Sequence, residues 1–227
     1  MTLPAIIIVT GTDTGIGKTI TTAALAATLI AAGRTVAMYK PCQSGASFGD
    51  SDVDEVNRLV PLSHAENGIV LGLPMAPVAA AEIDDVSLPP VSVHAMRIRA
   101  LAETVDHVLV EGSGGLLVDL DDEGRTLANL ALLLGHQAGF VVVARPALGT
   151  LNHVALTLEA LRSRKLRIIG LVLGTWPKSP GAVELSNREV FAAGPVPLLG
   201  SLPENAAALP SAKFRAAARG WLDGLTL

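Results

Sequence analysis

The amino-acid sequence predicts a three-layer α/β fold built on a mainly parallel, doubly wound sheet. Short apolar runs rich in Val and Ile alternate with longer stretches whose apolar residues recur every three or four positions, a pattern typical of strands alternating with helices. Hydrophobic residues make up 50% of the chain and charged residues only 17%, so the chain can bury a large core. Its 227 residues suit one domain, and we expect that domain to span 1–227.

The composition argues against several classes of protein. Aromatic residues make up 3% and the net charge is −4, whereas nucleic-acid-binding proteins usually carry stacking aromatics and a basic excess. We therefore expect no nucleic-acid partner. A single cysteine, Cys42, excludes an internal disulfide and suits a reducing compartment. No charged-then-apolar leader opens the chain and no apolar run approaches about 20 residues, so we expect a cytoplasmic protein with no membrane partner.

The first elements are a strand at 5–10, a glycine-rich turn at 11–19 and a helix at 20–32. The strand reads A-I-I-I-V-T, and the helix is rich in Ala and Leu. The turn ends in Gly17-Lys18-Thr19, as a phosphate-binding P-loop does. Converging backbone N–H groups, the helix N-terminus and Lys18 can hold phosphates, and the Thr19 hydroxyl can ligate Mg²⁺.

The turn departs from the strict P-loop pattern at one position. That pattern places a small residue at Thr12, but the leading glycine here is Gly11. Glycine-rich turns also occur at strand–helix corners that bind no ligand. The buried strand before this turn and the helix after it favour the phosphate-binding interpretation.

A second strand, T-V-A-M-Y, follows Gly33 and runs into Lys40-Pro41-Cys42-Gln43-Ser44-Gly45. The carboxyl ends of parallel strands share one edge of a sheet, so we expect Lys40 to lie close to Lys18 and the phosphates. The alternative is a solvated lysine at a strand end. No basic neighbour of Cys42 is evident, so we interpret this residue as packed and not as a nucleophile.

Residues 49–60 place Ser and Asp ahead of an apolar-periodic stretch, as at a capped helix start. Asp50, Asp52 and Asp54 are therefore capping or solvated residues for the most part, although one of them can turn toward a metal held by Thr19. Residues 61–90 are rich in Pro, Gly and Ala and predict no clear element, apart from an extended or turn-like conformation at 74–77.

A helix at about 91–104 and a strand at 107–110 lead to Glu111-Gly112-Ser113-Gly114-Gly115. An acidic residue at the tip of a buried strand can complete a Mg²⁺ site together with waters and phosphate oxygens. A serine nucleophile elbow would need glycine where Glu111 stands, which excludes that reading of Ser113. His107 and the other histidines lack metal-ligand spacing.

The second half of the chain continues the alternation. We expect strands at 139–144, at 167–173 and within 197–203, a helix that opens at 148–153 and a last helix at about 211–222. The strand ends carry Gly174-Thr175-Trp176 and Pro203-Glu204-Asn205. The N–H groups of Gly149, Thr150 and Leu151 open a helix and predict an anion site, to which Asn152 adds a side-chain donor.

Together these motifs resemble the dethiobiotin synthetase family, whose members close the ureido ring in biotin synthesis. The resemblance rests on V-T-G-T-D-T-G-I-G-K-T, Y-K-P-C-Q-S-G, the pair Ser51-Asp52, V-E-G-S-G-G, L-G-T-L-N-H and P-L-L-G-S-L-P, which follow the family's order through most of the chain. It implies a P-loop NTPase fold, a homodimer with active sites at its interface, and a reaction of 7,8-diaminopelargonate, CO₂ and ATP or another nucleoside triphosphate.

The resemblance also implies a role for individual residues. Lys18 and Lys40 would be catalytic, neutralising the phosphoryl group and the substrate carbamate, and Thr19, Asp52 and Glu111 would hold Mg²⁺. The nucleotide would contact Gly15, Ile16, Gly17, Lys18, Thr19, Ile20, Asp52, Glu111, Gly112, Ser113, Gly114, Gly174, Thr175, Pro203, Glu204 and Asn205. The substrate would contact Thr14, Lys40, Ser44, Leu148, Gly149, Thr150, Leu151 and Asn152.

Two positions depart from the family pattern. Many members carry a longer acidic residue at Gly15, and an Asn-Asp type pair often stands where Gly174 and Thr175 stand here, which leaves the base preference and the role of Trp176 open. The alternative function is that of a partitioning or positioning ATPase, but those proteins carry a lysine at Thr12. In that case the helix at 211–222 would lie on a membrane instead of docking on the core. A small-molecule kinase is disfavoured because no second lid or substrate domain is evident.

Overall fold

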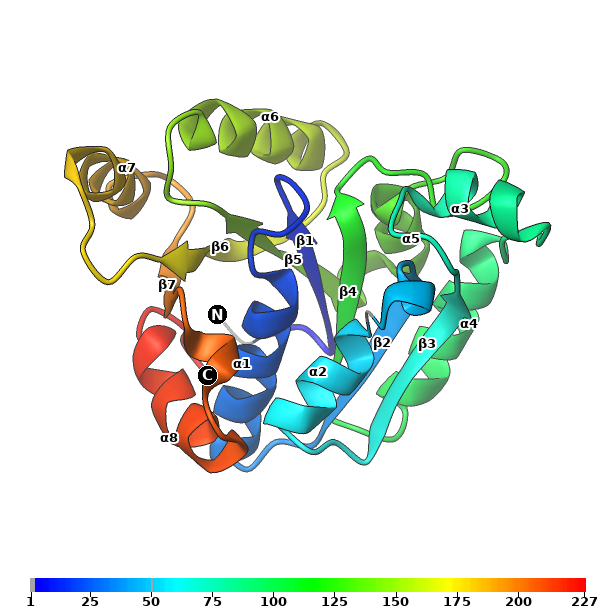
Figure 1. Ribbon diagram of the computed structural model, residues 1–227, viewed down its shortest axis with the longest axis horizontal. Helices are drawn as coiled ribbons and strands as arrows, with labels where there is room; N and C mark the ends of the chain where they lie inside the picture. Colours follow the sequence, from blue (N-terminus) through cyan, green and yellow to red (C-terminus); the bar gives the residue numbers. More distant parts are fainter. Residues whose placement is uncertain (1–2, 50) are drawn as a thin grey trace.

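The computed structural model describes residues 3–49 and 51–227. Its centre is a seven-stranded sheet in the order β3-β2-β4-β1-β5-β6-β7, in which every neighbouring pair runs parallel. The strands are β1 (Ile6–Gly11), β2 (Val36–Gln43), β3 (His64–Val70), β4 (His107–Gly115), β5 (Ala138–Ala144), β6 (Ile168–Trp176) and β7 (Leu198–Pro203). The expected parallel, doubly wound sheet is thus confirmed, and Figure 1 shows it between two helical layers.

Alternate residues of the central strand β1 pack into the two helical layers. Ile6 and Ile8 join one hydrophobic cluster, and Ile7 and Val9 join the other, because successive side chains of a strand point to opposite faces. All four side chains are fully buried. A strand buried on both faces reads as a continuous apolar run, which explains why β1 is recognisable in the sequence.

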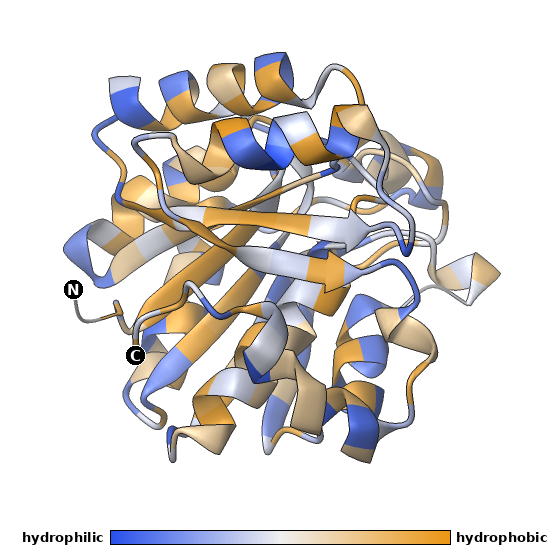
Figure 2. Cartoon of the chain, turned by 90° about the vertical axis from the view of Figure 1, so that its left-hand side faces the viewer, coloured by the Kyte–Doolittle hydropathy of each residue, from blue (hydrophilic) through white to orange (hydrophobic). Residues whose placement is uncertain are grey.

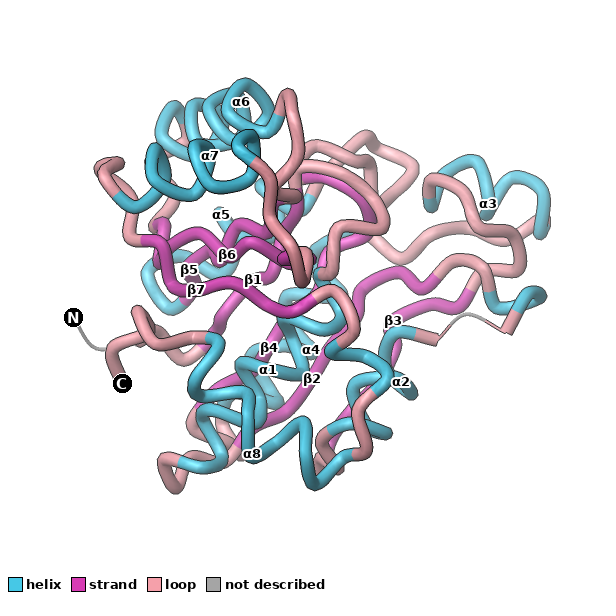
Figure 3. Tube along the Cα trace, turned by 60° about the vertical axis from the view of Figure 1, so that its left-hand side comes forward, coloured by secondary structure: helices cyan, strands magenta, loops and turns pink. Residues whose placement is uncertain are grey.

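The helices divide between the two faces of the sheet. The helices are α1 (Lys18–Ala31), α2 (Asp52–Leu59), α3 (Pro77–Asp84), α4 (Val91–Ala102), α5 (Leu127–Leu134), α6 (Thr150–Ser163), α7 (Ala182–Ala192) and α8 (Ser211–Trp221). Helices α1, α2 and α8 pack on the face of Ile7, and α4, α5, α6 and α7 contribute to the cluster on the face of Ile8. Figure 3 shows α6 and α7 on one side of the strands and α1 and α8 on the other.

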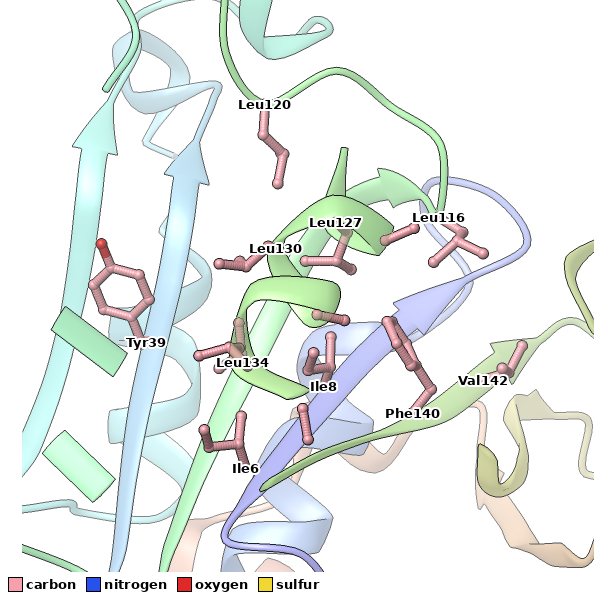
Figure 4. Packing of buried hydrophobic residues seen from close by; sticks show 14 of the residues in the cluster. Ile6, Ile8, Tyr39, Leu116, Leu120, Leu127, Leu130, Leu134, Phe140 and Val142 are labelled. Atoms are coloured by element: carbon pink, nitrogen blue, oxygen red, sulfur yellow. The ribbon is translucent and has the colours of Figure 1, made fainter. Parts of the chain in front are cut away.

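Both layers bury apolar side chains at helical spacing. In α5, Leu127, Leu130 and Leu134 are buried and lie over Ile8 and its neighbours (Figure 4). In Figure 2 the strands are hydrophobic over much of their length, whereas the helices alternate between hydrophobic and hydrophilic residues. This division is the expected one for amphipathic helices that cover a buried sheet.

The structure contains elements that the sequence pattern did not indicate. Strand β3 falls within the stretch 61–90, and its residues H-A-E-N-G-I-V are partly exposed because β3 forms an edge of the sheet. Helices α3, α5 and α7 were also not anticipated. Strand β2 continues past Tyr39 to Gln43 and includes Pro41, which is tolerated because the pairing of β2 with β4 ends at Tyr39.

The last helix, α8, docks on the core. Phe214 and Ala218 are fully buried against the α1 layer, and the rings of Phe214 and Trp221 lie 5.1 Å apart in an edge-on arrangement. The apolar face of α8 is therefore used within the fold, which counts against the membrane-surface alternative. Within the described residues, no helix is long and apolar enough to cross a membrane.

Candidate active site

The P-loop wraps the N-terminus of α1 at the edge where the parallel strands end. Gly15 and Gly17 have φ values of 69° and 92°, in the left-handed region that glycine adopts without strain. Gly17 occupies the N-cap position and no side chain caps the helix, so the first N–H groups of α1 are not used by a capping side chain. Thr12 N donates to Val143 O at 3.0 Å and ties the loop to β5. This is the geometry of an anion site at a helix N-terminus.

Lys18 lies folded back along this loop. Its Nζ donates to the carbonyl oxygen of Asp13 at 2.8 Å, and the side chain is buried. Burial lowers the pKa of Lys18; Glu111 and Asp52 oppose this effect, and Lys40 adds to it. Lys40 therefore lies close enough to act on Lys18 electrostatically, as its position at the end of β2 led us to expect.

Thr19, Asp52 and Glu111 meet beside the loop. Thr19 Oγ1 lies 2.7 Å from Asp52 Oδ1 and 2.9 Å from Glu111 Oε1. These three residues come from the starts of α1 and α2 and from β4. Of the three neighbouring aspartates, Asp52 therefore faces Thr19. Asp54 is exposed, and Asp50 lies outside the described residues.

Lys40 bridges the two carboxylates. Its Nζ lies 2.5 Å from Asp52 Oδ2 and 3.2 Å from Glu111 Oε1, and the residue is only 3% exposed, so the solvated alternative is wrong. Burial alone would lower the pKa of Lys40, but Glu111 and Asp52 together raise it above its ordinary value. For Asp52 the two effects have the opposite signs. Burial alone would raise the pKa of its carboxyl, but Lys40, together with Thr19 and Lys18, lowers that pKa below its ordinary value.

Neighbouring polar groups hold this cluster in place. Gln43 Oε1 accepts a hydrogen bond from Asp52 N at 2.9 Å, and Ser51 Oγ caps α2 by accepting from Asp54 N at 3.2 Å. Ser113, expected at the nucleotide, donates from its hydroxyl to Cys42 O at 2.6 Å and so ties β4 to β2. Gln43 was not among the expected site residues, although its place at the end of β2, three residues after Lys40, was a usable signal.

The donor set suits Mg²⁺. Among the described residues, no group of three or more His, Cys, Asp and Glu side chains forms a complete metal cage. Two carboxylates and a hydroxyl are instead a partial shell, and Mg²⁺ typically binds proteins through one or two carboxylates while substrate phosphates and waters fill the other positions. Thr19, Asp52 and Glu111 therefore fit this ion better than Zn²⁺, which prefers His and Cys.

A cavity of about 460 Å³ lies next to the P-loop, and residues 14–16 of the loop form part of its lining. Its lining comprises Thr14, Gly15, Ile16, Arg145, Pro146, Ala147, Thr175, Pro177 and Glu184. Four of these, Thr14, Gly15, Ile16 and Thr175, were expected to contact nucleotide or substrate. Arg145, which was not among the expected site residues, forms an ion pair with Asp13 of the loop. A second cavity of about 400 Å³, lined by Thr28 and Arg219 among others, contains none of the expected residues.

The expected second anion site opens α6. Gly149 caps the helix with a φ of 90° and no side-chain hydrogen bond. Thr150 N donates to Ala147 O at 3.3 Å within the preceding turn. Leu151 and Asn152 are exposed, and Leu148 is 85% exposed although it is apolar. Asn187 of α7 supports the preceding turn by donating from Nδ2 to Pro146 O at 2.8 Å.

Other expected residues lie at the ends of β2, β6 and β7, whereas Ile20 lies in α1 and Gly112 and Gly114 lie in β4. Ser44 follows β2, and its carbonyl accepts from Gln43 Nε2 at 2.7 Å. Pro203 pairs with Trp176, Glu204 N donates to Trp176 O at 2.9 Å, and Asn205 is exposed just beyond. The guanidinium of Arg188 lies 5.1 Å from the centre of the Trp176 ring, so that ring is at least partly used in packing.

Cys42 and two histidines have structural environments. Burial raises the pKa of the Cys42 thiol to about 12, although Lys40 opposes the shift, so the interpretation of a packed cysteine is confirmed. His94 Nδ1 lies 2.7 Å from the hydroxyl of Tyr39, and His107 Nδ1 lies 2.9 Å from Pro4 O.

Comparisons with known proteins agree with the site. A family model described as an AAA domain matches residues 6–211. The ATP-dependent dethiobiotin synthetase BioD of Mycobacterium avium is 47% identical over 96% of this chain and 95% of that protein. The enzyme of the same name from Streptomyces avermitilis is 43% identical over 96% and 92% of the two chains.

Solved structures show the same fold at much lower identity. The septum site-determining protein MinD of Pyrococcus horikoshii, solved with Mg-ADP, has a TM-score of 0.58 and 20% identity over 96% of this chain and 91% of that chain. At such identity the likeness concerns the P-loop NTPase fold alone, whereas the Mycobacterium avium synthetase matches the same share of this chain at more than twice the identity. The chain belongs to the family of ATP-dependent dethiobiotin synthetases.

Proposed function

We propose that this chain closes the ureido ring of dethiobiotin from 7,8-diaminopelargonate, CO₂ and ATP. One substrate amine adds to CO₂ and releases a proton, giving a carbamate. A carbamate oxygen then attacks the terminal phosphorus of ATP, so that ADP leaves and a carbamic-phosphoric anhydride forms. The second amine attacks the carbamoyl carbon and releases a proton, phosphate leaves, and the ring closes. No side-chain nucleophile is needed, so positioning and electrostatic stabilisation carry the catalysis.

The convergence of Lys18, Lys40, Thr19, Asp52 and Glu111 at one edge of the sheet is the observation that carries this proposal. Lys18 neutralises the transferred phosphoryl group, and Lys40 neutralises the carbamate or the phosphate beside it. Both ammonium groups are buried, and at low dielectric they attract a nearby negative charge more strongly than they would in water. The P-loop N–H groups hold the triphosphate in line with the attacking oxygen.

Thr19, Asp52 and Glu111 are the residues that would hold Mg²⁺. When bound, this ion neutralises charge on the phosphate oxygens during transfer. Lys40 forms ion pairs with two of these residues, Asp52 and Glu111. Lys40 is thus held by the same two carboxylates that face the triphosphate, which fixes its ammonium group at the reacting end of the site.

The substrate's own carboxylate requires a second anion site, for which the start of α6 is suited. Leu151 and Asn152 are exposed there beside the apolar Leu148. In our proposal the protein is a homodimer, and each chain contributes residues 148–152 to its partner's active site. A two-fold interface supplies this contact twice. We further propose that the whole chain is a single domain and that it acts in the cytoplasm.

An assay of triphosphate hydrolysis tests this function directly. ATP turnover by the purified protein should require both 7,8-diaminopelargonate and bicarbonate, and dethiobiotin should appear in equal amount with ADP. If ATP turnover does not depend on the diamine but increases when vesicles or DNA are added, the result would instead favour a positioning ATPase. Thr12, at the position where those proteins carry a lysine, argues against that outcome.

A further inference from the structure

Thr22 links α1 to the strand that carries Glu111. It lies three residues after Thr19 and four after Lys18, which places it on the same side of the helix one turn further in. The residue is completely buried. Its Oγ1 lies 3.0 Å from the backbone carbonyl oxygen of Lys18 and 3.0 Å from Oε2 of Glu111.

The two oxygens of Glu111 have different neighbours. Oε1 faces Thr19 Oγ1 at 2.9 Å and Lys40 Nζ at 3.2 Å, whereas Oε2 faces Thr22. Glu111 is only 1% exposed, so the hydrogen bonds of its carboxylate must come largely from protein groups. The last side-chain torsion of glutamate has a broad energy minimum, so the torsion alone does not fix the orientation of the carboxylate. Hydrogen-bond donors on both oxygens restrict that orientation. Thr22 supplies the donor on the side away from Thr19 and Lys40.

The Thr22 hydroxyl has one proton and two acceptors within reach. A carboxylate is the stronger acceptor, because its charge strengthens the hydrogen bond relative to that of a neutral carbonyl. Thr28, two turns further along the same helix, shows what such a residue does without a carboxylate. Its Oγ1 donates to Ala24 O at 2.8 Å, and the side chain is also buried. The contact with Glu111 therefore distinguishes Thr22 from an ordinary buried helix threonine.

We propose that Thr22 is a positioning residue that fixes the Glu111 carboxylate for the divalent cation. The inference rests on the proposed function, because the cation belongs to it. Groups behind a metal ligand typically affect metal affinity or activity by about 10- to 100-fold when they are removed. Thr22→Val keeps the shape of the side chain and removes its donor, and Thr22→Ala removes the donor with less bulk. Thr22→Ser keeps the donor.

Binding of Mn²⁺ in the presence of ADP, followed by electron paramagnetic resonance, tests the proposal without turnover. Thr22→Val and Thr22→Ala should weaken Mn²⁺ binding by about 10- to 100-fold. Thr22→Ser and the control Thr28→Val should stay within about threefold of wild type. ADP binding in EDTA should change little in all four variants, because the P-loop itself is untouched. Thermal melting checks that each variant is folded.

A double-mutant cycle then asks whether Thr22 acts through Glu111. In a Glu111→Gln background, Thr22→Val should have little further effect on Mn²⁺ binding, because the carboxylate that it positions is gone. Full additivity would overturn the proposal, and so would a Thr22→Val or Thr22→Ala variant that is folded and binds Mn²⁺ like wild type. A Thr22→Ser variant as weak as Thr22→Val would also overturn it. If wild type itself binds no Mn²⁺, the proposed metal site fails instead.

Discussion

Gly174, at the end of β6, packs directly against Gly17 of the P-loop. A Cβ added at Gly17 would lie 2.5 Å from the carbonyl oxygen of Gly174, and one added at Gly174 would lie 2.0 Å from the carbonyl oxygen of Ile16. Both obstacles are backbone atoms, which cannot swing aside. We predict that Gly174→Ala displaces the loop, destabilises the protein by about 1–3 kcal/mol and weakens ATP binding. Urea unfolding and nucleotide titration measure the two effects.

Gly220 provides the control for this substitution. It lies in α8 with nothing within 4 Å of an added Cβ, so Gly220→Ala should leave nucleotide affinity unchanged and raise stability by up to about 1 kcal/mol. Equal behaviour of the two variants would show that the contact between Gly174 and the P-loop has no role in holding the loop.

Replacement of Lys40 should destabilise the protein even without ligands. Lys40→Met leaves Glu111 and Asp52 without their cation, and Glu111 is buried. Removal of one partner of a buried ion pair costs about 3–5 kcal/mol, and the partial exposure of Asp52 places our expectation near the lower end. Arg145→Ala removes a half-exposed pair with Asp13 and should cost at most about 1 kcal/mol. Denaturant melts of the two variants without ligand would contradict this contrast if their midpoints were shifted equally.

The proposed metal ligands predict different effects for two nearby carboxylates. Glu111→Gln keeps the size of the side chain but removes its charge, so the Mg²⁺ concentration that gives half-maximal activity should rise by about tenfold or more. Asp54 is exposed, and Asp54→Asn should leave that concentration unchanged. Matching Mg²⁺ titrations of ring closure would refute this ligand assignment if they coincided, or if Asp54→Asn were the more impaired.

His94 should make stability depend on pH. Burial lowers its pKa from 6.5 to about 4, against the opposing effect of Asp121. Between these two values the unfolded chain binds a proton that the folded chain does not, so stability falls as the pH drops from 6.5 toward 4. The loss attributable to His94 is about 3 kcal/mol when complete, from the size of the shift.

The variant His94→Asn isolates this contribution because asparagine does not titrate. Unfolding free energies from urea melts at several pH values should slope less steeply between pH 4 and 6.5 in the variant than in wild type. Identical slopes would show that His94 does not set this part of the acid sensitivity.

The motif-bearing parts of the site could be predicted because their chemistry is local. Two glycines, Lys18 and a helix N-terminus lie within a few residues of one another in the sequence, and the parallel sheet brings Lys40 and Glu111 to the same edge. Strand β3 could not be predicted, because its residues H-A-E-N-G-I-V are largely polar and lack the continuous apolar run of a buried strand. The contacts of Thr22 and Ser113 depend on the tertiary structure, since the same hydroxyl can bond its own helix, a ligand or a distant chain segment.

The shared site of the proposed homodimer can be tested by complementation. Lys18 would serve the site on its own chain, whereas Asn152 would serve the site of the partner. We expect Lys18→Ala and Asn152→Ala homodimers each to lose most activity, because removal of one preorganised contact commonly costs about 10²- to 10³-fold. After equal mixing with subunit exchange, about half of the dimers should be mixed, and each mixed dimer should regain one of its two sites.

Roughly a quarter of wild-type activity should therefore return on mixing, which a turnover assay detects easily above two inactive parents. Exchange must be measured independently, for example with differently tagged chains captured together. If exchange is complete and activity stays at the parental level, Lys18 and Asn152 belong to the same site on the same chain. In that case a mixed dimer has one site lacking the lysine and one lacking the asparagine, so no intact site can form, and the assignment of residues 148–152 to the partner's substrate would be wrong.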